Sequence, residues 1–150
     1  KWRADFLANK INGIVGPSGS GKSTLIRSIN RMNDEVAGHV LEGAIYVNNC
    51  DICTTDQDVV SLRTEVGMVF QKPSIFPMSI ADNVLFGIRH HKKLSKHEQL
   101  QTVEDNFKAV SLWQEVRHRL DDPAGSLSIG QQQRLCIART LAVKTPVSSS

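Results

Sequence analysis

Eight consecutive residues of this chain, Gly16-Pro17-Ser18-Gly19-Ser20-Gly21-Lys22-Ser23, match the pattern G-x-x-x-x-G-K-[ST]. The apolar residues 11–15 come directly before them, and Leu25, Ile29 and Met32 follow at the spacing of one helix face. This order predicts a strand, a loop and a helix, which is the context in which the pattern binds phosphates. We therefore expect an α/β protein built around a phosphate loop.

The composition of this loop suits a nucleoside triphosphate with Mg²⁺. Several backbone N–H groups must converge on the phosphates, and Gly16, Gly19 and Gly21 allow the backbone to curl around them. The Lys22 ammonium would lie against the terminal phosphates, Ser23 would ligate Mg²⁺, and the positive end of the following helix would face the anion. The predicted nucleotide-binding residues here are Gly16, Pro17, Ser18, Gly19, Ser20, Gly21, Lys22, Ser23 and Thr24.

The bulk composition fits a chain of one compact domain, or a fragment of a larger one. It has 150 residues, of which 40% are hydrophobic, and a formal net charge of +3. No apolar stretch approaches the roughly 18 to 20 residues of a membrane helix, and residues 1–5 lack the apolar run of a secretory signal. We therefore expect a soluble, intracellular protein.

The cysteines and one basic segment each allow two interpretations. The chain has three cysteines, and Cys50 and Cys53 form a C-x-x-C pair. A zinc site would need two further ligands, so structural thiols are the favoured interpretation. Residues 89–97 are strongly basic, but no aromatic residues interleave them. This favours a solvated loop and helix start over a nucleic-acid patch, and we expect no nucleic-acid partner.

Apolar spacing predicts the remaining elements. Short β-branched runs predict strands at residues 43–47 and 66–70, and Asn48-Asn49 is a turn signal after the first. From Ile80 onward the spacing becomes helical. The marker positions are Ile80, Val84 and Ile88 for one helix, Leu100, Val103, Phe107 and Val110 for the next, and Leu135, Ala138, Leu141 and Ala142 for a last helix that starts after Ser128 and stops at Pro146.

Two further motifs narrow the class of phosphate-loop protein, since the loop alone also fits kinases and GTPases. They are Val66-Gly67-Met68-Val69-Phe70-Gln71-Lys72-Pro73 and Leu127-Ser128-Ile129-Gly130-Gln131-Gln132-Gln133-Arg134. With them the chain resembles the ATP-binding subunits of ABC transporters. The resemblance implies that Gln71 contacts Mg²⁺ and the attacking water. It also implies that Ser128, Gly130 and Gln131 bind the γ-phosphate of a nucleotide held by a second subunit.

The resemblance also implies an architecture. It predicts a P-loop NTPase (RecA-like) core with a small β portion and a helical signature subdomain, with the C-terminal part of the sheet missing. Residues 1–75 would form a partial nucleotide-binding core, residues 76–140 the helical subdomain with the signature, and residues 141–150 a truncated return to the core.

Within the family, the chain looks most like the ATPases of phosphate importers. The likeness lies in Ser28-Ile29-Asn30-Arg31-Met32-Asn33-Asp34, in residues 66–88 and in residues 131–142. It implies a head-to-tail homodimer that binds ATP and Mg²⁺, and couples ATP hydrolysis to phosphate uptake. Such a subunit lies at the cytoplasmic face of the membrane and serves a phosphate-binding protein indirectly. It docks on permease subunits through the segment from Gln71 through the helical lobe, to which residues 89–97 could contribute, and Phe76 and Met78 are the positions that test this docking.

The sequence departs from that family in two respects. Ile129 stands where the signature has glycine, and its β-branched side chain would crowd the γ-phosphate or restrict the backbone. The family continues with an apolar strand that supplies an Asp and a catalytic Glu, but this sequence stops first, and neither Asp51 nor residues 121–122 replace them. An upstream aromatic residue that stacks on adenine is also missing, unless Trp2 substitutes for it.

These departures leave three hypotheses for the chain. No catalytic residue is assigned, and we expect weak nucleotide binding with poor hydrolysis, because water activation would lose its base. The first hypothesis is the transporter ATPase, as a fragment or a truncated gene product. The second is a nucleotide-binding remnant without turnover. The third is a small-molecule kinase on the same loop, with Arg117 and Arg119 as lid residues.

Overall fold

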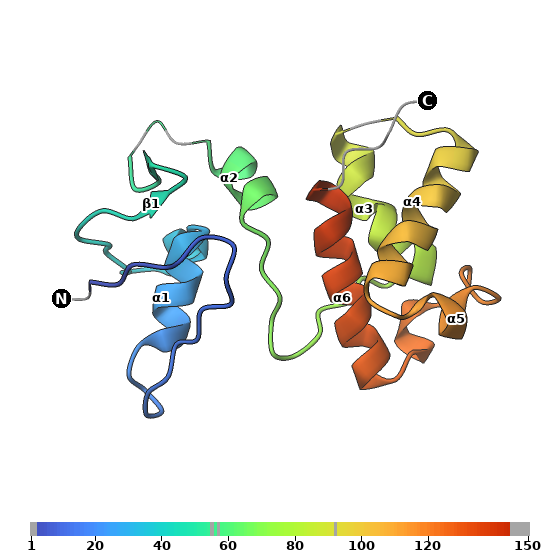
Figure 1. Cartoon of the computed structure of the whole chain (residues 1–150), viewed down its shortest axis with the longest axis horizontal. Helices are drawn as coiled ribbons and strands as arrows, with labels where there is room; N and C mark the ends of the chain where they lie inside the picture. Colours follow the sequence, from blue (N-terminus) through green and yellow to red (C-terminus); the bar gives the residue numbers. More distant parts are fainter. Residues whose placement is uncertain (1–2, 55, 57, 92, 145–150) are drawn as a thin grey trace. The chain divides into compact units, whose positions relative to one another are not determined.

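The glycine-rich loop leads directly into a helix, as its sequence predicts, in a computed structural model of the chain (Figure 1). The structure describes residues 3–54, 56, 58–91 and 93–144. Trp2 and Pro146, to which the sequence assigned roles, lie outside the described residues. The chain divides into two units, Lys1–Leu62 and Arg63–Ser150, and each is described by itself.

Among its described residues, the first unit contains a helix after the phosphate loop, a short 3-10 helix and a small hairpin. Helix α1 (Lys22–Ile29) is followed by η1 (Met32–Glu35). Strands β1 (Tyr46–Val47) and β2 (Cys50–Asp51) pair antiparallel, with Tyr46 opposite Asp51. Between them Asn48 and Asn49 have φ of 50° and 64°. Two successive left-handed residues are what a tight two-residue hairpin requires, and asparagine tolerates that conformation.

Two of the three predicted strands are wrong. Residues 11–15 and 66–70 form no strand, and residues 43–47 do so only at their end, in β1. Ile11 and Val15 are 104% and 95% exposed. An apolar run becomes a strand only when a neighbouring strand accepts its backbone hydrogen bonds, and no described segment pairs with these residues.

A short helix at Val59–Glu65 was not expected from the sequence. Helix α2 (Val59–Glu65) lies where the unit boundary falls. The Asp58 carboxylate accepts the Val60 N–H at 3.0 Å, as a residue before a helix start commonly does. Leu62 is its one buried residue. So short a helix, with a single apolar anchor, gives a weak periodic signal.

The second unit is helical, and its three longer helices fall where the apolar spacing predicted. They are α3 (Ile80–His91), α4 (Lys96–Ala109) and α6 (Ile129–Lys144), with the short α5 (Trp113–Val116) and η2 (Ala124–Ser126) between the last two. Helices α3, α4 and α6 lie side by side in Figure 1, each in contact with the other two. None of the helices in the described ranges is long and apolar enough to span a bilayer.

A single apolar core lies between these helices. Phe107 of α4 and Leu135 of α6 are fully buried in it, with Val84 of α3. Helices α3 and α6 approach closely at Gly87 of α3, where an added Cβ would come 2.6 Å from Cγ2 of Val143. The remaining core residues are Ile80, Leu85, Ile88, Val103, Leu112, Val116, Ala124, Leu127, Ala138 and Ala142.

The starts of α3 and α4 are closed by specific hydrogen bonds. Ser95 and Glu98 form a reciprocal capping box at α4, so the helix-start part of the basic segment is confirmed. At α3, the N–H groups of Ile80 and Ala81 donate to the carbonyls of Asp122 and Leu120. These bonds tie the turn that precedes α6 to the first turn of α3.

Candidate functional site

The loop between residues 16 and 23 holds a conformation that demands glycine at two positions. Gly19 and Gly21 have φ of 78° and 88°, in the left-handed region that side chains disfavour. The Ser20 N–H donates to the Pro17 carbonyl at 3.3 Å and closes a turn. At Gly16 an added Cβ would lie 3.1 Å from the Ser20 Oγ. The sequence thus curls the backbone into a small concave loop.

The Lys22 side chain folds back over this loop. Its Nζ donates to the carbonyls of Gly16 and Pro17 at 2.8 and 2.6 Å, and to the Ser20 Oγ at 3.3 Å. A positive charge is therefore held at the mouth of the turn. An ammonium in this place attracts anionic ligands to the loop.

The N-terminus of α1 is open to an anion. Its N-cap, Gly21, provides no side-chain cap, and the first turn carries no acidic residue. The first helical bond runs from the Leu25 N–H to the Gly21 carbonyl at 2.9 Å, which leaves the preceding N–H groups without a helical acceptor. The Ser23 and Thr24 side chains are exposed beside them. These groups suit a phosphate chain and, through the Ser23 hydroxyl, its cation.

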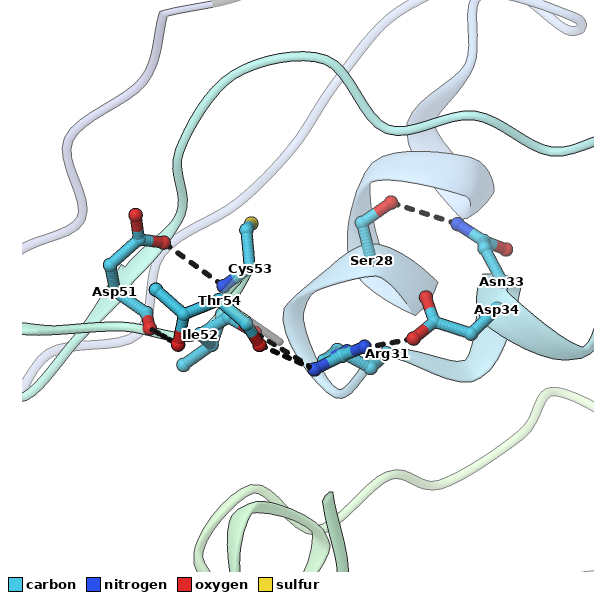
Figure 2. Close-up of polar contacts among 8 residues, drawn as sticks. All are labelled: Ser28, Arg31, Asn33, Asp34, Asp51, Ile52, Cys53 and Thr54. Carbon is cyan, nitrogen blue, oxygen red and sulfur yellow. Dashed lines mark hydrogen bonds and ion pairs between the residues drawn. The ribbon is translucent and has the colours of Figure 1, made fainter. Parts of the chain in front are cut away.

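Buried polar residues fix the far end of α1 (Figure 2). The Ser28 hydroxyl donates to the Thr24 carbonyl at 2.9 Å, and the Asn33 amide donates to the Ser28 Oγ and to the Thr24 carbonyl, both at 2.8 Å. Ser28 and Asn33 are only 5% and 4% exposed. Helix α1 is thereby anchored to η1 behind the loop.

Arg31 connects η1 with the residues that follow the hairpin (Figure 2). Its backbone is left-handed, with φ of 58°, and its Nε pairs with Asp34 at 2.7 Å. Its Nη1 donates to the carbonyls of Thr54 and Ile52, at 3.2 and 3.5 Å. The segment after β2 is thus tied to the residues that follow α1.

The thiols of Cys50 and Cys53 lie at this hairpin. Cys50 is exposed and Cys53 is half-buried. Burial is the main cause that raises the pKa of the Cys53 thiol. Within the described ranges no group of three or more His, Cys, Asp or Glu is placed to hold a metal ion.

In the second unit, the segment after Gln71 is held by helix α6. The Gln133 amide donates to the Gln71 carbonyl at 3.4 Å. The Ser74 carbonyl accepts from Nη2 of Arg139 at 2.6 Å and from the buried Cys136 thiol at 3.5 Å. The Gln71 side chain itself is exposed.

Asn83, fully buried on α3, closes the same segment from the other side. Its carboxamide oxygen accepts the Phe76 N–H at 2.9 Å, and its amide nitrogen donates to the Ser79 carbonyl at 2.9 Å. The Phe76 ring packs against Phe86 with ring centres 4.5 Å apart. A buried amide satisfied in this way fixes the path of residues 76–79.

The start of α6 is a second capping box. The Ser128 N–H donates to the Gln131 Oε1 at 2.9 Å, and the Gln131 N–H donates back to the Ser128 Oγ at 3.3 Å. Ile129, the first residue of α6, is 69% exposed, and Gly130 has open space around it. The Ile129 side chain therefore points away from the core, and its backbone is helical.

An ionic cluster lies against this capping box. The Glu115 carboxylate of α5 accepts from the Gln131 Nε2 at 2.8 Å and from the Arg134 Nη1 at 2.7 Å. The hydrogen bonds from Arg134 and then Gln131 lower the pKa of the Glu115 carboxyl. Arg134 also donates to the Ser111 carbonyl at 2.8 Å.

The predicted site residues fall into separate units. All of the phosphate-loop residues, including Ser23, belong to the first unit, whereas Gln71, Ser128, Gly130 and Gln131 belong to the second. Three residues that hold these segments, Glu115, Gln133 and Arg139, were missed. The capping pattern of Ser128 and Gln131 is a signal that sequence reading could have used. The contacts made by Glu115 and Arg139 join residues that are far apart in the sequence, so no short sequence pattern indicates them.

Comparison with known proteins matches almost the whole chain to one family and to curated relatives. The profile of the ABC transporter family matches residues 3–148. The chain is 55% identical, over 142 residues, to the phosphate import ATP-binding protein PstB of Thermotoga maritima. It is 49% identical, over 143 residues, to a PstB protein of Streptococcus agalactiae. Each match covers 95% of this chain but only 57% of the relative.

Solved structures show the same likeness. The chain is similar to CbiO1 of Clostridium perfringens, part of an ABC transporter complex, with 30% identity and a TM-score of 0.67 over 87% of this chain and 49% of that one. It is also similar to the ATP-binding cassette MJ0796, in a dimeric post-hydrolysis state with ADP and Pi. That match has 31% identity and a TM-score of 0.65, over 85% of this chain and 54% of the other.

Proposed function

This chain belongs to the ABC transporter family, and on that premise we propose that it is the nucleotide-binding portion of the ATP-hydrolysing subunit of a phosphate importer. The chain spans 57% of the length of the curated relatives described above. Hydrolysis, phosphate uptake and assembly with other subunits are accordingly proposed for the whole protein. The kinase hypothesis gains no support from this family.

The geometry of the phosphate loop carries the proposal. Left-handed Gly19 and Gly21 turn the backbone, the Lys22 ammonium lies over the turn, and the N-terminus of α1 opens toward it. These groups match what a triphosphate offers, namely several oxygens with a high negative charge. We infer that Gly16 to Thr24 hold the phosphates of ATP.

The magnesium ion of MgATP would be held at the same place. The exposed Ser23 hydroxyl, on the first turn of α1, is a hard oxygen ligand of the kind that Mg²⁺ prefers. The family resemblance names Gln71 as a further ligand of this ion, and Gln71 belongs to the second unit. When bound, the ion neutralises charge on the phosphate oxygens.

A second copy of the chain would complete the site. The Ser128 capping box presents a helix start and a hydroxyl, which suit a γ-phosphate. We propose that Ser128, Gly130 and Gln131 contact the nucleotide held by the partner in a head-to-tail homodimer. The dimeric state of the MJ0796 cassette, with ADP and Pi bound, supports the proposal of a dimer.

Phosphate is proposed as the transported solute because PstB, at 55% identity, is a phosphate import protein. The subunit would lie at the cytoplasmic face of the membrane and dock on permease subunits, which receive phosphate from a binding protein. The segment fixed by Asn83, with Phe76 and Met78, is the proposed docking face.

The test is MgATP binding measured by isothermal titration calorimetry. Lys22→Ala removes the ammonium at the loop and should lower the affinity at least about tenfold, since hydrogen bonds to charged groups are strong. Lys108→Ala, which removes an exposed lysine of α4 paired with Glu104, serves as the matched control and should bind like the parent.

Either of two results would count against the proposal. One is a parent chain that shows no MgATP binding. The other is equal affinity in the parent and in Lys22→Ala, which would place the nucleotide elsewhere.

A further inference from the structure

We propose that Glu115 is a positioning residue for the start of α6. Its carboxylate fixes the orientation of the Gln131 carboxamide, and through it the Ser128 cap. The inference rests on the proposed function, because Ser128 and Gln131 are taken to engage the nucleotide of a partner subunit. Glu115 itself touches no nucleotide in this scheme.

The Glu115 carboxylate is held rigidly before it acts on Gln131. Its Oε1 accepts from the Arg134 Nη1 at 2.7 Å, and its Oε2 from the Arg134 Nη2 at 3.1 Å. Such a two-point pair fixes the plane of the carboxylate. Arg134 is fixed in turn by its bond to the Ser111 carbonyl at 2.8 Å. With its plane fixed in this way, the carboxylate also accepts a hydrogen bond from the Gln131 Nε2, through Oε2 at 2.8 Å.

The carboxylate decides which way the Gln131 amide faces. A side-chain amide can present either its oxygen or its nitrogen to a neighbour, but an ionised carboxylate only accepts hydrogen bonds. The Gln131 nitrogen must therefore face Glu115. Its Oε1 is left to accept the Ser128 N–H, at 2.9 Å.

The Ser128 hydroxyl is prepared by the same chain of contacts. Its Oγ accepts the Gln131 N–H at 3.3 Å, so the hydroxyl proton remains available to donate to an anion. Without Glu115 the Gln131 amide can rotate, and both bonds of the capping box lose their fixed geometry. Engagement of a phosphate oxygen by Ser128 should weaken accordingly.

A purely stabilising role is the alternative, and the exposure of the cluster argues against it. The side chains of Glu115 and Arg134 are 42% and 33% exposed. Ion pairs at such exposed positions contribute little to folding stability. Glu115→Ala should therefore affect nucleotide engagement by α6 more than it affects folding.

The experiment compares two ATP-dependent properties of the full 150-residue chain. Calorimetry at low protein concentration measures MgATP affinity at the phosphate loop, and sedimentation velocity measures MgATP-driven dimerisation. Glu115→Ala should change the MgATP affinity by no more than about twofold. It should weaken MgATP-driven dimerisation about tenfold, as expected for loss of a charged hydrogen bond. Glu104→Ala, which removes an α4 carboxylate that pairs with Lys108, should change neither.

The conservative variant Glu115→Gln separates positioning from charge pairing. Its amide oxygen can still accept from the Gln131 Nε2, so dimerisation should recover most of the loss. Hydrogen exchange at the Ser128 N–H should follow the same order, fastest in Glu115→Ala. If Glu115→Gln is as defective as Glu115→Ala, the residue acts through its charge and the inference is overturned.

The remaining outcomes distinguish this inference from the proposed function. A parent chain that dimerises with MgATP, together with Glu115→Ala that dimerises equally well, overturns the inference alone. A parent chain that binds MgATP but never dimerises overturns the proposed dimer, and the inference fails with it.

Discussion

The guanidinium carbon of Arg139 lies 4.2 Å from the centre of the Phe76 ring. One guanidinium nitrogen donates to the Ser74 carbonyl at 2.6 Å. Burial lowers the pKa of the Arg139 guanidinium from its ordinary value. Helix α6, which begins at the Ser128 capping box, is thus joined to the segment after Gln71 by a charged side chain, in addition to the bonds from Gln133 and Cys136.

Arg139→Ala should lower the free energy of unfolding by about 2 kcal/mol, because it removes a charged hydrogen bond and a cation–π contact. Arg139→Lys should recover less than half, since an ammonium cannot stack and bond in the same plane. Urea denaturation measures both. Arg117→Ala, at an exposed arginine of the same unit, is the control; equal losses in Arg117→Ala and Arg139→Ala would contradict the assignment.

Gly67→Ala should destabilise the second unit by about 1–3 kcal/mol, because its Cβ would lie 2.2 Å from Cγ2 of Thr140. The Thr140 rotamer is fixed by the bond from its Oγ1 to the Cys136 carbonyl at 2.9 Å. Thr140→Ser removes Cγ2 and keeps that bond, so the double variant should regain most of the stability. Thermal unfolding of the parent, the two single variants and the double variant measures this double-mutant cycle.

Gly125→Ala is the matched control for that cycle, because nothing lies within 4 Å of an added Cβ there. A change at Gly125 as large as that at Gly67 would show that lost backbone freedom, and not the clash, is responsible.

Asp82 should make stability depend on acid pH. The Ser79 hydroxyl, at 2.8 Å, and then Arg89, at 2.7 Å, hold the pKa of the Asp82 carboxyl below its ordinary value. A depressed pKa in the folded chain gives stability that is present above the ordinary pKa of about 3.9 and is lost as the pH falls through the lower folded value. Asp82→Asn should therefore flatten the loss of stability below about pH 4.

Urea unfolding between about pH 6 and pH 2.5 tests this prediction, with Asp121→Asn, an exposed aspartate, as the control variant. An acid limb equally steep in Asp82→Asn and in the parent would rule out this linkage.

Gly21→Ala should weaken MgATP binding and cost about 1–2 kcal/mol in stability, because φ there is 88° and a Cβ is strained in the left-handed region. Gly13→Ala lies outside the loop, has open space around it and has no left-handed φ, so it should bind like the parent. Calorimetry and urea unfolding read the two effects. Normal affinity in Gly21→Ala would mean that the loop conformation does not control binding.

The fold could be predicted where the signal is local. The helical spacing of Ile80, Val84 and Ile88 recurs as the buried face of α3, and the glycine pattern places the start of α1 at Lys22. The strands predicted at residues 11–15 and 66–70 were wrong, because no local signal decides whether such runs form strands. Whether an apolar run forms a strand depends on a partner elsewhere in the protein, and residues 11–15 carry no information about that partner.

In the candidate site, too, the residues with a local sequence signal could be predicted and those set by distant contacts could not. The phosphate loop and the Ser128 segment are contiguous motifs, and their residues could be named from the sequence. The residues that hold them in place are distant in the chain: Glu115 is 16 positions from Gln131, and Ser74 is 65 positions from Arg139. Such pairs depend on how α5 and the segment after Gln71 lie against α6, which no short pattern encodes.

Because the Lys22 side chain folds back over the loop, a ligand that binds there must replace the present hydrogen-bond acceptors of its ammonium. Its ammonium is already satisfied by the Gly16 and Pro17 carbonyls, so an incoming molecule must displace neutral acceptors and supply better ones. Anionic oxygens do so, because hydrogen bonds to charged acceptors are roughly twice as strong as those to neutral ones. Sugars, alcohols and water offer no such advantage. Uncharged molecules therefore do not displace the Gly16 and Pro17 carbonyls from the Lys22 ammonium. The loop favours anions through this exchange of hydrogen bonds, whatever the shape of the ligand.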